Sequence, residues 1–502
     1  MPASPRRLAL GLLALSLTTA ACGLKPTAYD SIKQNNGGSL TGNGNNNAGS
    51  GVGNGGTTTG GGTTGGGGTT AGGTTGGGFV GGGTTGGGTT GGGTTVGGTT
   101  GGGTGGGTNG GPRPQCSAPT GGDTTGISAS NISIGVHAPI SGTGTPFPNN
   151  SFIAGAQTYW KTHKVCGRTV TVEVLDDTYK PSGAHAVCQQ MAKRDFMVIG
   201  AGGTDQIQAC ATDSVIQKNQ VPYLSAGVTT NGLTSLNNYF ALSLTYQQQG
   251  DLVVNNAKAL GVDKPAPATG GKKKQWAIVT AAGPNFEGAR KGIESALSSR
   301  GITYEEFTID QSGNYQQDAQ SKGSTLALDG YKTIFVDLAP GYFVFMAGGY
   351  YAGGSGATWV GPGVTFTEVT VAQYLCTSTH NSISGHAYFL APNPALDKST
   401  ADFRNAYGGK YDDISWALWG LSEGLYNLLL NASDNLTRQN FIAKTQQARI
   451  STQVYPGIDF PRGGGHFGGT AAWSQKVDCN GTQPNQNQPG TWLTSSSTYY
   501  KI

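Results

Sequence analysis

The chain has 502 residues, of which 88 are glycine, and only 12% of its residues are charged. Residues 126–502 carry 26 Lys and Arg against 25 Asp and Glu, so the formal net charge of +4 comes mostly from the N-terminal part. This balance argues against a nucleic-acid binder, which usually carries a basic stripe.

The first residues have the pattern of an export signal. Two arginines precede an apolar stretch at 8–17, which is too short to span a bilayer as a helix. Small residues and then Cys22 follow, as in a bacterial lipoprotein signal, although Thr19 stands where such signals usually carry Leu. We expect residues 1–21 to be the signal peptide and Cys22 to be lipidated. Cleavage of a plain secretory signal is the alternative.

A segment rich in Gly and Thr follows the anchored N-terminus at 22–36. Between residues 37 and 111 there are 40 Gly and 20 Thr, and no charged residue. Such a segment has too few apolar side chains to offset the entropy of ordering a core. We therefore expect residues 37–125 to be a disordered linker. It would hold a folded domain away from the membrane, on the extracytoplasmic (cell-wall or periplasmic) side of a bacterial cell.

After the linker, strands alternate with helices in two series, which a pause near 245–249 separates. The predicted strands are 131–136, 169–175, 196–199, 222–224, 276–280, 303–309 and 333–337, and the predicted helices are 152–163, 182–194, 205–218, 250–260, 286–299 and 316–328. Such alternation forms βαβ units and parallel sheets. The predicted fold class is therefore α/β, with two doubly wound parallel-sheet lobes. A ligand would bind beyond the carboxyl ends of the strands.

Short motifs in chain order carry a resemblance to a known family. They are IGVHAPISG at 134–142, LDD at 175–177, VIG at 198–200, VPYLSAGVT at 221–229, FEG at 286–288 and WVGP at 359–362. Their order and spacing resemble the type I periplasmic binding proteins, specifically the group that binds branched-chain amino acids. The resemblance implies a ligand cleft between the lobes and three crossings of the chain. Lobe 1 would comprise 126–247 and 387–470, including a helix at 416–430, and lobe 2 would comprise 248–386 and 471–502.

The resemblance also implies which first-lobe residues contact a ligand. Thr204 and Thr229, the latter beside Val228, stand where amino-acid binders hold the ligand carboxylate. Phe147 stands where an aromatic side chain packs on the ligand, and Trp416 lies near a further aromatic position. A helix N-cap explains a Thr after a strand equally well, and Phe147 could equally anchor its loop.

In the second lobe, Asn285 or Phe286 occupies the matching loop. One departure from the family pattern concerns the ligand ammonium, because Gly363 stands where amino-acid binders usually have a carboxylate. A buried ammonium without a partner is costly. Either Asp205 or Asp337 at a strand end substitutes for that carboxylate, or the ligand is not an α-amino acid.

The cysteine count fits an exported protein. Lipidation of Cys22 leaves six cysteines, and six allow 15 disulfide connectivities. In a doubly wound lobe the helices after the second and third strands lie side by side, which favours a Cys188–Cys210 disulfide. The remaining cysteines are then expected to pair as Cys116–Cys166 and Cys376–Cys479.

No pattern in the sequence favours an enzyme, a metal site or a cofactor. Residues 420–424 match the G-x-S-x-G motif, but their flanks continue one helical stripe, whereas that motif needs a strand before it. The six histidines are scattered, and the sequence has no C-x-x-C. His137, at the end of the first strand, is the histidine closest to the expected cleft.

The predicted function is that of the extracytoplasmic solute-binding lipoprotein of an ABC importer. It would close two lobes on a small polar solute, an amino acid or a related compound. Its partners would be that solute and the permease subunits in the membrane, and it would act as a monomer. Two alternatives stay open: a ligand sensor of the same fold without a transport role, and a tethered surface protein that binds the cell wall.

Overall fold

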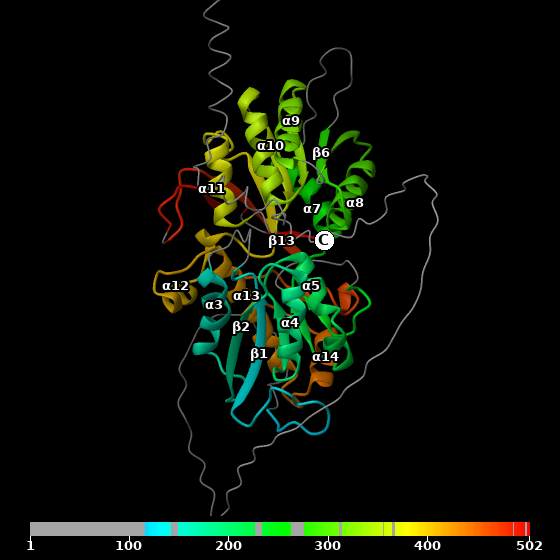
Figure 1. Cartoon of the computed structure of the whole chain (residues 1–502), viewed down its shortest axis with the longest axis vertical. Helices are drawn as coiled ribbons and strands as arrows, with labels where there is room; N and C mark the ends of the chain where they lie inside the picture. Colours follow the sequence, from blue (N-terminus) through cyan, green and yellow to red (C-terminus); the bar gives the residue numbers. More distant parts are fainter. Residues whose placement is uncertain are drawn as a thin grey trace, which may run out of the picture. The chain divides into compact units, whose positions relative to one another are not determined.

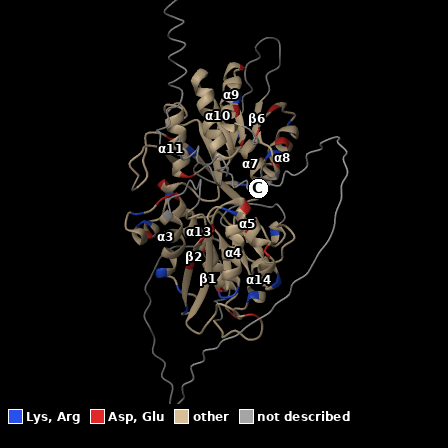
Figure 2. Ribbon diagram, in the orientation of Figure 1, with Lys and Arg blue, Asp and Glu red and all other residues tan. Residues whose placement is uncertain are grey.

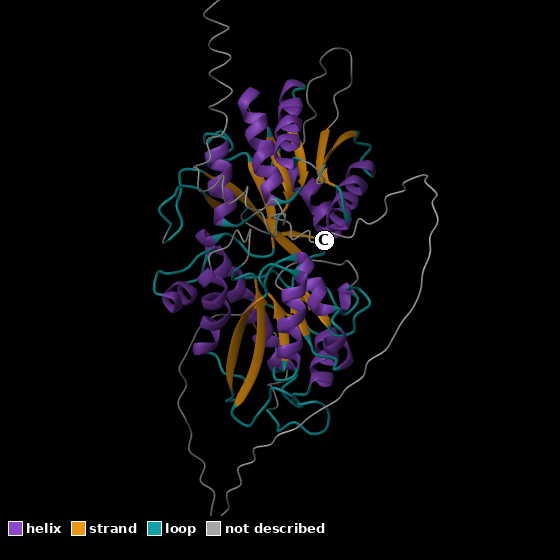
Figure 3. Ribbon diagram, in the orientation of Figure 1, coloured by secondary structure: helices purple, strands orange, loops and turns teal. Residues whose placement is uncertain are grey.

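The computed structural model describes residues 116–141, 149–225, 233–262, 276–310, 314–354, 356–363, 367–484, 486–496 and 499–502. They form an α/β fold, as predicted (Figure 1, Figure 3). The predicted signal peptide, Cys22 and residues 37–115 of the predicted linker lie outside the described part. Among the described helices, none combines the length and the apolar character that crossing a bilayer requires.

The first lobe is built on a parallel sheet with the strand order β2-β1-β3-β4-β5. The strands are β1 (Asn131–Ala138), β2 (Thr169–Asp176), β3 (Met197–Gly200), β4 (Tyr223–Ser225) and β5 (Tyr239–Ala241). The helices are α3 (Asn149–Thr158), α4 (Pro181–Ala192), α5 (Thr204–Ala211), α6 (Ser214–Lys218), α12 (Ala401–Tyr407), α13 (Asp413–Asn431) and α14 (Arg438–Gln446). Side chains of α3, α13 and α14 share one core cluster with β1, and those of α4, α5 and α6 share another with β4 and β5.

The second lobe has a mixed sheet with the order β14-β13-β10-β9-β8-β6-β7. Its parallel strands are β6 (Trp276–Ala281), β7 (Tyr304–Ile309), β8 (Thr333–Asp337), β9 (Thr358–Pro362) and β10 (Ala387–Ala391), and its antiparallel strands are β13 (Ala471–Asp478), β14 (Thr491–Thr494) and β15 (Tyr500–Lys501). The helices are α7 (Tyr246–Ala259), α8 (Pro284–Ser298), α9 (Tyr315–Leu328), α10 (Pro340–Gly353) and α11 (Val369–Ser378).

The lobe boundary expected at residue 387 is wrong by the length of one strand. β10 pairs with β9 on one side and with β13 on the other, so residues 387–391 belong to the second sheet. The chain crosses back to the first lobe after β10, through residues 392–396. Helix α13 packs in the first-lobe core and β13 joins the second sheet, as the sequence predicted for both.

The predicted linker is too long at its C-terminal end. Residues 116–125 are held on the first lobe, because Cys116 forms a disulfide with Cys166 and Asp123 forms an ion pair with the buried Arg438. The structure has the three predicted disulfides, with Cα–Cα distances of 5.5, 5.7 and 5.4 Å for Cys116–Cys166, Cys188–Cys210 and Cys376–Cys479. Cys188 and Cys210 join α4 to α5, the two helices that were expected to lie side by side.

Side-chain caps set several helix boundaries that periodicity alone misplaced. The helix predicted at 205–218 is two helices, because the Asp213 carboxylate accepts a hydrogen bond from the Val215 amide and starts α6. Helix α7 begins earlier than predicted, at a capping box between Thr245 and Gln248. This cap places Tyr246, the first residue of α7, directly after the crossing from the first lobe.

Candidate functional site

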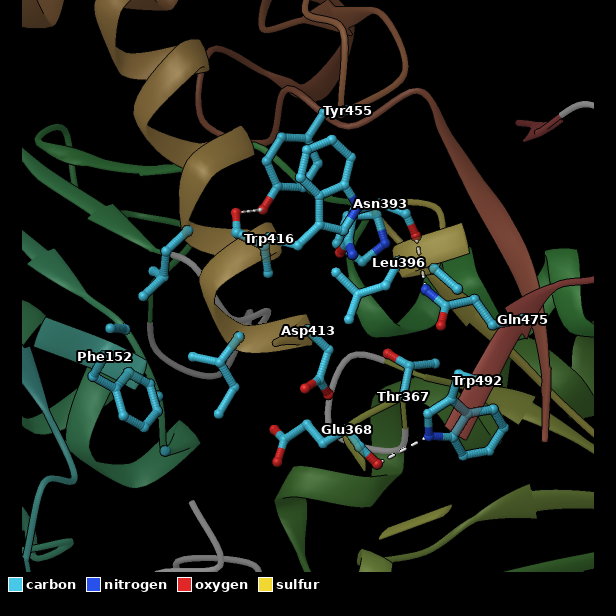
Figure 4. Close-up of a pocket in the computed structure, with 18 of the residues that line it drawn as sticks. Phe152, Thr367, Glu368, Asn393, Leu396, Asp413, Trp416, Tyr455, Gln475 and Trp492 are labelled. Atoms are coloured by element: carbon cyan, nitrogen blue, oxygen red, sulfur yellow. Dashed lines mark hydrogen bonds between the residues drawn. The ribbon is translucent and has the colours of Figure 1, made fainter. Parts of the chain in front are cut away.

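A cavity lies between the lobes and takes its walls from both of them (Figure 4). Its volume is about 100 Å³. The first lobe contributes residues 201–204 before and within α5 and residues 413–414 and 416–418 of α13. The second lobe contributes residues 367–368 before α11, Gln475 of β13 and Trp492 of β14. Residues 392–393 and 395–396 of the crossing line it as well.

Aromatic side chains of this cavity are held in place by hydrogen bonds to main-chain oxygens. The Trp416 indole is fully buried and donates from Nε1 to the carbonyl of Pro394, at 2.9 Å. Trp492 donates from Nε1 to the carbonyl of Glu368, also at 2.9 Å. The Tyr455 hydroxyl donates to Ala417 at 3.0 Å. Because their polar atoms are satisfied within the protein, these rings present apolar surface to a ligand.

The crossing segment is also tied to the second sheet. The Gln475 side-chain amide donates to the carbonyl of Asn393 at 2.9 Å (Figure 4). This hydrogen bond connects Gln475, a wall residue from β13, to the segment that joins the two lobes. A ligand that contacts Gln475 would act directly on the position of the crossing.

Two acidic side chains line the cavity from opposite lobes. Asp413 begins α13, and its Oδ2 accepts a hydrogen bond from the backbone amide of Val369 at 2.7 Å. Glu368 immediately precedes α11. The second carboxylate oxygen of each residue, Asp413 Oδ1 and Glu368 Oε2, is buried and has no hydrogen-bond partner.

Burial and mutual repulsion shift the titration of these acids. Burial, followed by the neighbouring Asp412 charge, raises the pKa of Asp413 to about 8. Burial, followed by Asp413 and Asp412, raises the pKa of Glu368 well above its usual value. Asp412 accepts hydrogen bonds from the Ser415 amide and hydroxyl, both at 2.8 Å, and from the Ser151 hydroxyl. The site therefore disfavours a full set of negative charges unless a cation joins it.

The opposite end of the cavity is formed at the start of α5. Gly203, with φ of +76°, lets the chain turn into α5 in a conformation that side chains rarely adopt. Thr204 follows and lines the cavity with Tyr246 of the second lobe. Burial raises the pKa of Tyr246 to about 12, against the opposing effect of a hydrogen bond with the Thr204 hydroxyl. This pair is a second polar connection between the lobes.

The structure brings only part of the predicted site together. Thr204 and Trp416 line the cavity, whereas Phe286 is buried in the second-lobe core. Neither carboxylate proposed as the ammonium partner is among the lining residues. Asp337 is 5% exposed and accepts a hydrogen bond from Thr280 at 3.1 Å, and Asp205 lies within α5. The predicted residues that lie outside the described part are Phe147, Val228, Thr229 and the side chain of Asn285.

The two acids that do line the cavity, Glu368 and Asp413, were not predicted from the sequence. Glu368 lies five residues after Gly363, and Gly363 stands where the family pattern has a carboxylate. Asp413 stands three residues before Trp416, at the start of a helix that was predicted to begin later. The signal that could have found them was their place at helix N-termini, where acidic residues are common for reasons unrelated to ligands.

His137 belongs to a separate buried network. Its Nδ1 lies 2.8 Å from Asp177 Oδ2 and its Nε2 lies 2.7 Å from the Tyr223 hydroxyl. The ring lies close to Cys188 and Cys210, a grouping whose spacing would suit a metal ion. Both sulfurs are bonded to each other, so they supply no thiolate for a metal. His137 is a satisfied core residue in this structure.

Charged residues of both signs are interspersed over the described helices and loops (Figure 2).

Comparison with known proteins complements this geometry. Comparison with curated protein sequences gives no match. Among solved structures, a fatty acid ABC transporter substrate-binding protein from Thermomonospora curvata is similar with a TM-score of 0.58 and 16% identity, over 77% of this chain and 96% of that one.

Two further solved structures have the same fold. A leucine-binding protein from Thermotoga maritima matches with a TM-score of 0.56 and 14% identity, over 74% of this chain and 99% of that one. A solute-binding protein of an ABC transporter from Rhodopseudomonas palustris was solved in complex with 3,4-dihydroxybenzoic acid. It matches with a TM-score of 0.57 and 15% identity, over 74% of this chain and 98% of that one. The family model described as periplasmic binding protein matches residues 131–483. The match spans most of the chain, and the two-lobed fold agrees with the type I resemblance of the motifs. The protein therefore belongs to the periplasmic binding protein family.

Proposed function

We propose that the protein is the extracytoplasmic solute receptor of an ABC importer. Anchored through a lipid on Cys22, it closes its two lobes on a small polar solute, an amino acid or a related compound, and delivers the solute to permease subunits in the membrane. The observation that carries this proposal is the cavity between the lobes, whose walls come from both lobes and from the crossing between them.

The polar connections across this cavity support a closing motion. Asp413 of the first lobe accepts a hydrogen bond from Val369 of the second lobe, and Thr204 of the first lobe interacts with Tyr246 of the second. A solute that contacts both lobes adds to these few connections and stabilises the closed arrangement. The structural neighbours described as ABC transporter substrate-binding proteins support the same role.

A binding screen tests the proposal directly. The full chain with Cys22→Ser would be mixed with a library of amino acids, amines, carboxylic acids and sugars, and its thermal unfolding followed. At 100 times its dissociation constant, a true solute adds about 2.7 kcal/mol to the free energy of unfolding. It should also reduce the radius of gyration in solution scattering. If no solute in the library stabilises the protein, solute binding is the wrong function.

Uptake measurements separate the importer from a sensor of the same fold. Cells that lack the protein should lose uptake of the solute found in the screen, and the restored gene should recover it. Unchanged uptake together with intact binding would favour a sensor.

The lipid anchor has its own test. With Cys22→Ser the protein should move from the detergent phase to the aqueous phase when cells are partitioned, because the lipid needs the cysteine sulfur. A variant that stays in the detergent phase would contradict the anchor.

A further inference from the structure

Some buried polar atoms of the cavity have no hydrogen-bond partner, and they share the capacity to accept a hydrogen bond. Among its described lining residues, the buried side-chain atoms without a partner are Glu368 Oε2, Asp413 Oδ1 and Gln483 Oε1. When the two acids are ionised, the state that a bound cation favours, all three atoms are hydrogen-bond acceptors. Gln483 is only 4% exposed, so its carbonyl has little access to water. A buried acceptor without a donor costs free energy, which a ligand that donates N–H groups would recover.

No described side chain of the cavity balances the charge that the two acids carry once they ionise. The described lining residues include no Lys, Arg or His. The sequence of 142–148, 226–232 and 364–366, which fall outside the described part, contains none either. A further carboxylate, Asp412, repels both acids. The positive charge that this arrangement lacks is therefore expected to arrive with the ligand.

The rest of the wall limits what else the ligand carries. Trp416, Trp492, Phe152 and Leu396 surround the acids with apolar surface. Aromatic faces favour a cation or an apolar group beside them. The small volume of about 100 Å³ suits a compact body.

Resting on the proposed function, we propose that the solute carries a cationic nitrogen group, an amine or an amidine, on a short apolar or aromatic body. Its N–H groups donate to Glu368 of the second lobe and Asp413 of the first, so that the cation itself bridges the lobes. This departs from the structural neighbours described as binding fatty acids or benzoic acids, because those ligands are anions. An anion in this cavity would meet two acidic side chains and no described Lys, Arg or His.

Matched compounds of opposite charge test the proposal. Isopentylamine, 4-methylpentanoate and leucine share one apolar body, and benzylamine and benzoate share another. Each would be measured by calorimetry on the full chain with Cys22→Ser at pH 8, next to the wider solute screen. We expect the amines to bind and the two carboxylates to give no heat. Carboxylates that bind more tightly than the matched amines would overturn the proposal and leave the solute-receptor function intact.

Variants of the two acids complete the test. Glu368→Gln and Asp413→Asn keep an acceptor oxygen but remove the charge, and each should weaken amine binding by about 10-fold to 100-fold. Glu423→Gln is the matched control, since Glu423 also lies on α13 with an unpartnered buried oxygen but is not among the lining residues. Amine affinities equal to the parent in both cavity variants would also overturn the proposal. If the screen yields only anionic or sugar ligands, the cationic class is wrong, whereas a screen without any ligand overturns the receptor function instead.

Discussion

The Asp413 carboxylate accepts a hydrogen bond at 2.7 Å from the backbone amide of Val369, which lies 44 positions earlier in the chain. Asp413 is the first residue of α13 in the first lobe, and Val369 is the first residue of α11 in the second. One side chain therefore satisfies a free amide at a helix N-terminus of the opposite lobe and also lines the cavity. Under the proposed function, lobe closure and solute binding would both involve this residue.

The pH dependence of the solute-free protein should reveal Asp413. Its pKa is raised by burial to about 8 in the folded state, from an ordinary value of 3.8. Between these values the folded chain holds a proton that the unfolded chain has released, so this group's contribution to stability is lost as pH rises through that window. Asp413→Asn does not ionise and keeps an acceptor for Val369. It should therefore unfold a few degrees higher than the parent at pH 8, with little difference near pH 4.

Thermal unfolding at both pH values measures this effect. The acidic groups that face Asp413 are Glu368 and Asp412. Asp402→Asn, at an exposed position of α12, serves as the control and should behave alike at both pH values. An equal change in melting temperature at pH 4 and pH 8 would show that Asp413 does not titrate as described.

Thr204 should contribute to solute affinity without contributing much to stability. Thr204→Ala removes the hydroxyl that lines the cavity and hydrogen-bonds with Tyr246. We expect solute binding to weaken by about 1–3 kcal/mol, measured by calorimetry with the solute found in the screen. Thr212→Ala, at the other end of α5, where the hydroxyl donates to the Gln208 carbonyl at 2.8 Å, is the control and should leave affinity unchanged. Equal affinities in the two variants would remove Thr204 from the site.

Two glycines of α10 should respond differently to the same substitution. A Cβ on Gly349 would overlap the backbone oxygen of Gln320, where α10 crosses α9, whereas a Cβ on Gly353 meets no atom within 4 Å. Gly349→Ala should therefore lower the free energy of unfolding by about 1–3 kcal/mol. Gly353→Ala should be neutral or stabilising by up to about 1 kcal/mol. Urea unfolding measures both, and a neutral Gly349→Ala would contradict the close packing of these helices.

Arg438 should be important for stability because it is 1% exposed and serves several acceptors at once. Its guanidinium donates to the Phe196 carbonyl at 3.0 Å and to Asp123 at 2.8 Å, among other oxygens. A lysine has one nitrogen and reaches fewer of them, so Arg438→Lys should cost at least about 2 kcal/mol in urea unfolding. Arg449→Lys, at a largely exposed ion pair with Asp459, should cost less than about 1 kcal/mol. Similar costs for the two variants would contradict this account.

Local patterns in the sequence were enough to predict much of the fold. Alternating strands and helices predicted two doubly wound lobes, because the period of apolar residues along the chain reflects which face of each element is buried. The same order of strands predicted that α4 and α5 are neighbours, and the structure joins them through Cys188 and Cys210. Helix α10 was not predicted, because it is apolar on nearly every side and lacks the periodic pattern of a half-exposed helix.

The acidic pair of the cavity was decided by the tertiary structure alone. Glu368 and Asp413 belong to different lobes, and each taken singly resembles an ordinary acidic residue at a helix N-terminus. Their shared burial, their unpartnered oxygens and their raised pKa values arise only when the chain crosses between the lobes and brings α11 and α13 together. The sequence by itself determined which segments fold into strands and helices, because that depends on neighbouring residues. Which charges face each other in the cavity depends on contacts between distant segments, and only the folded chain makes those contacts.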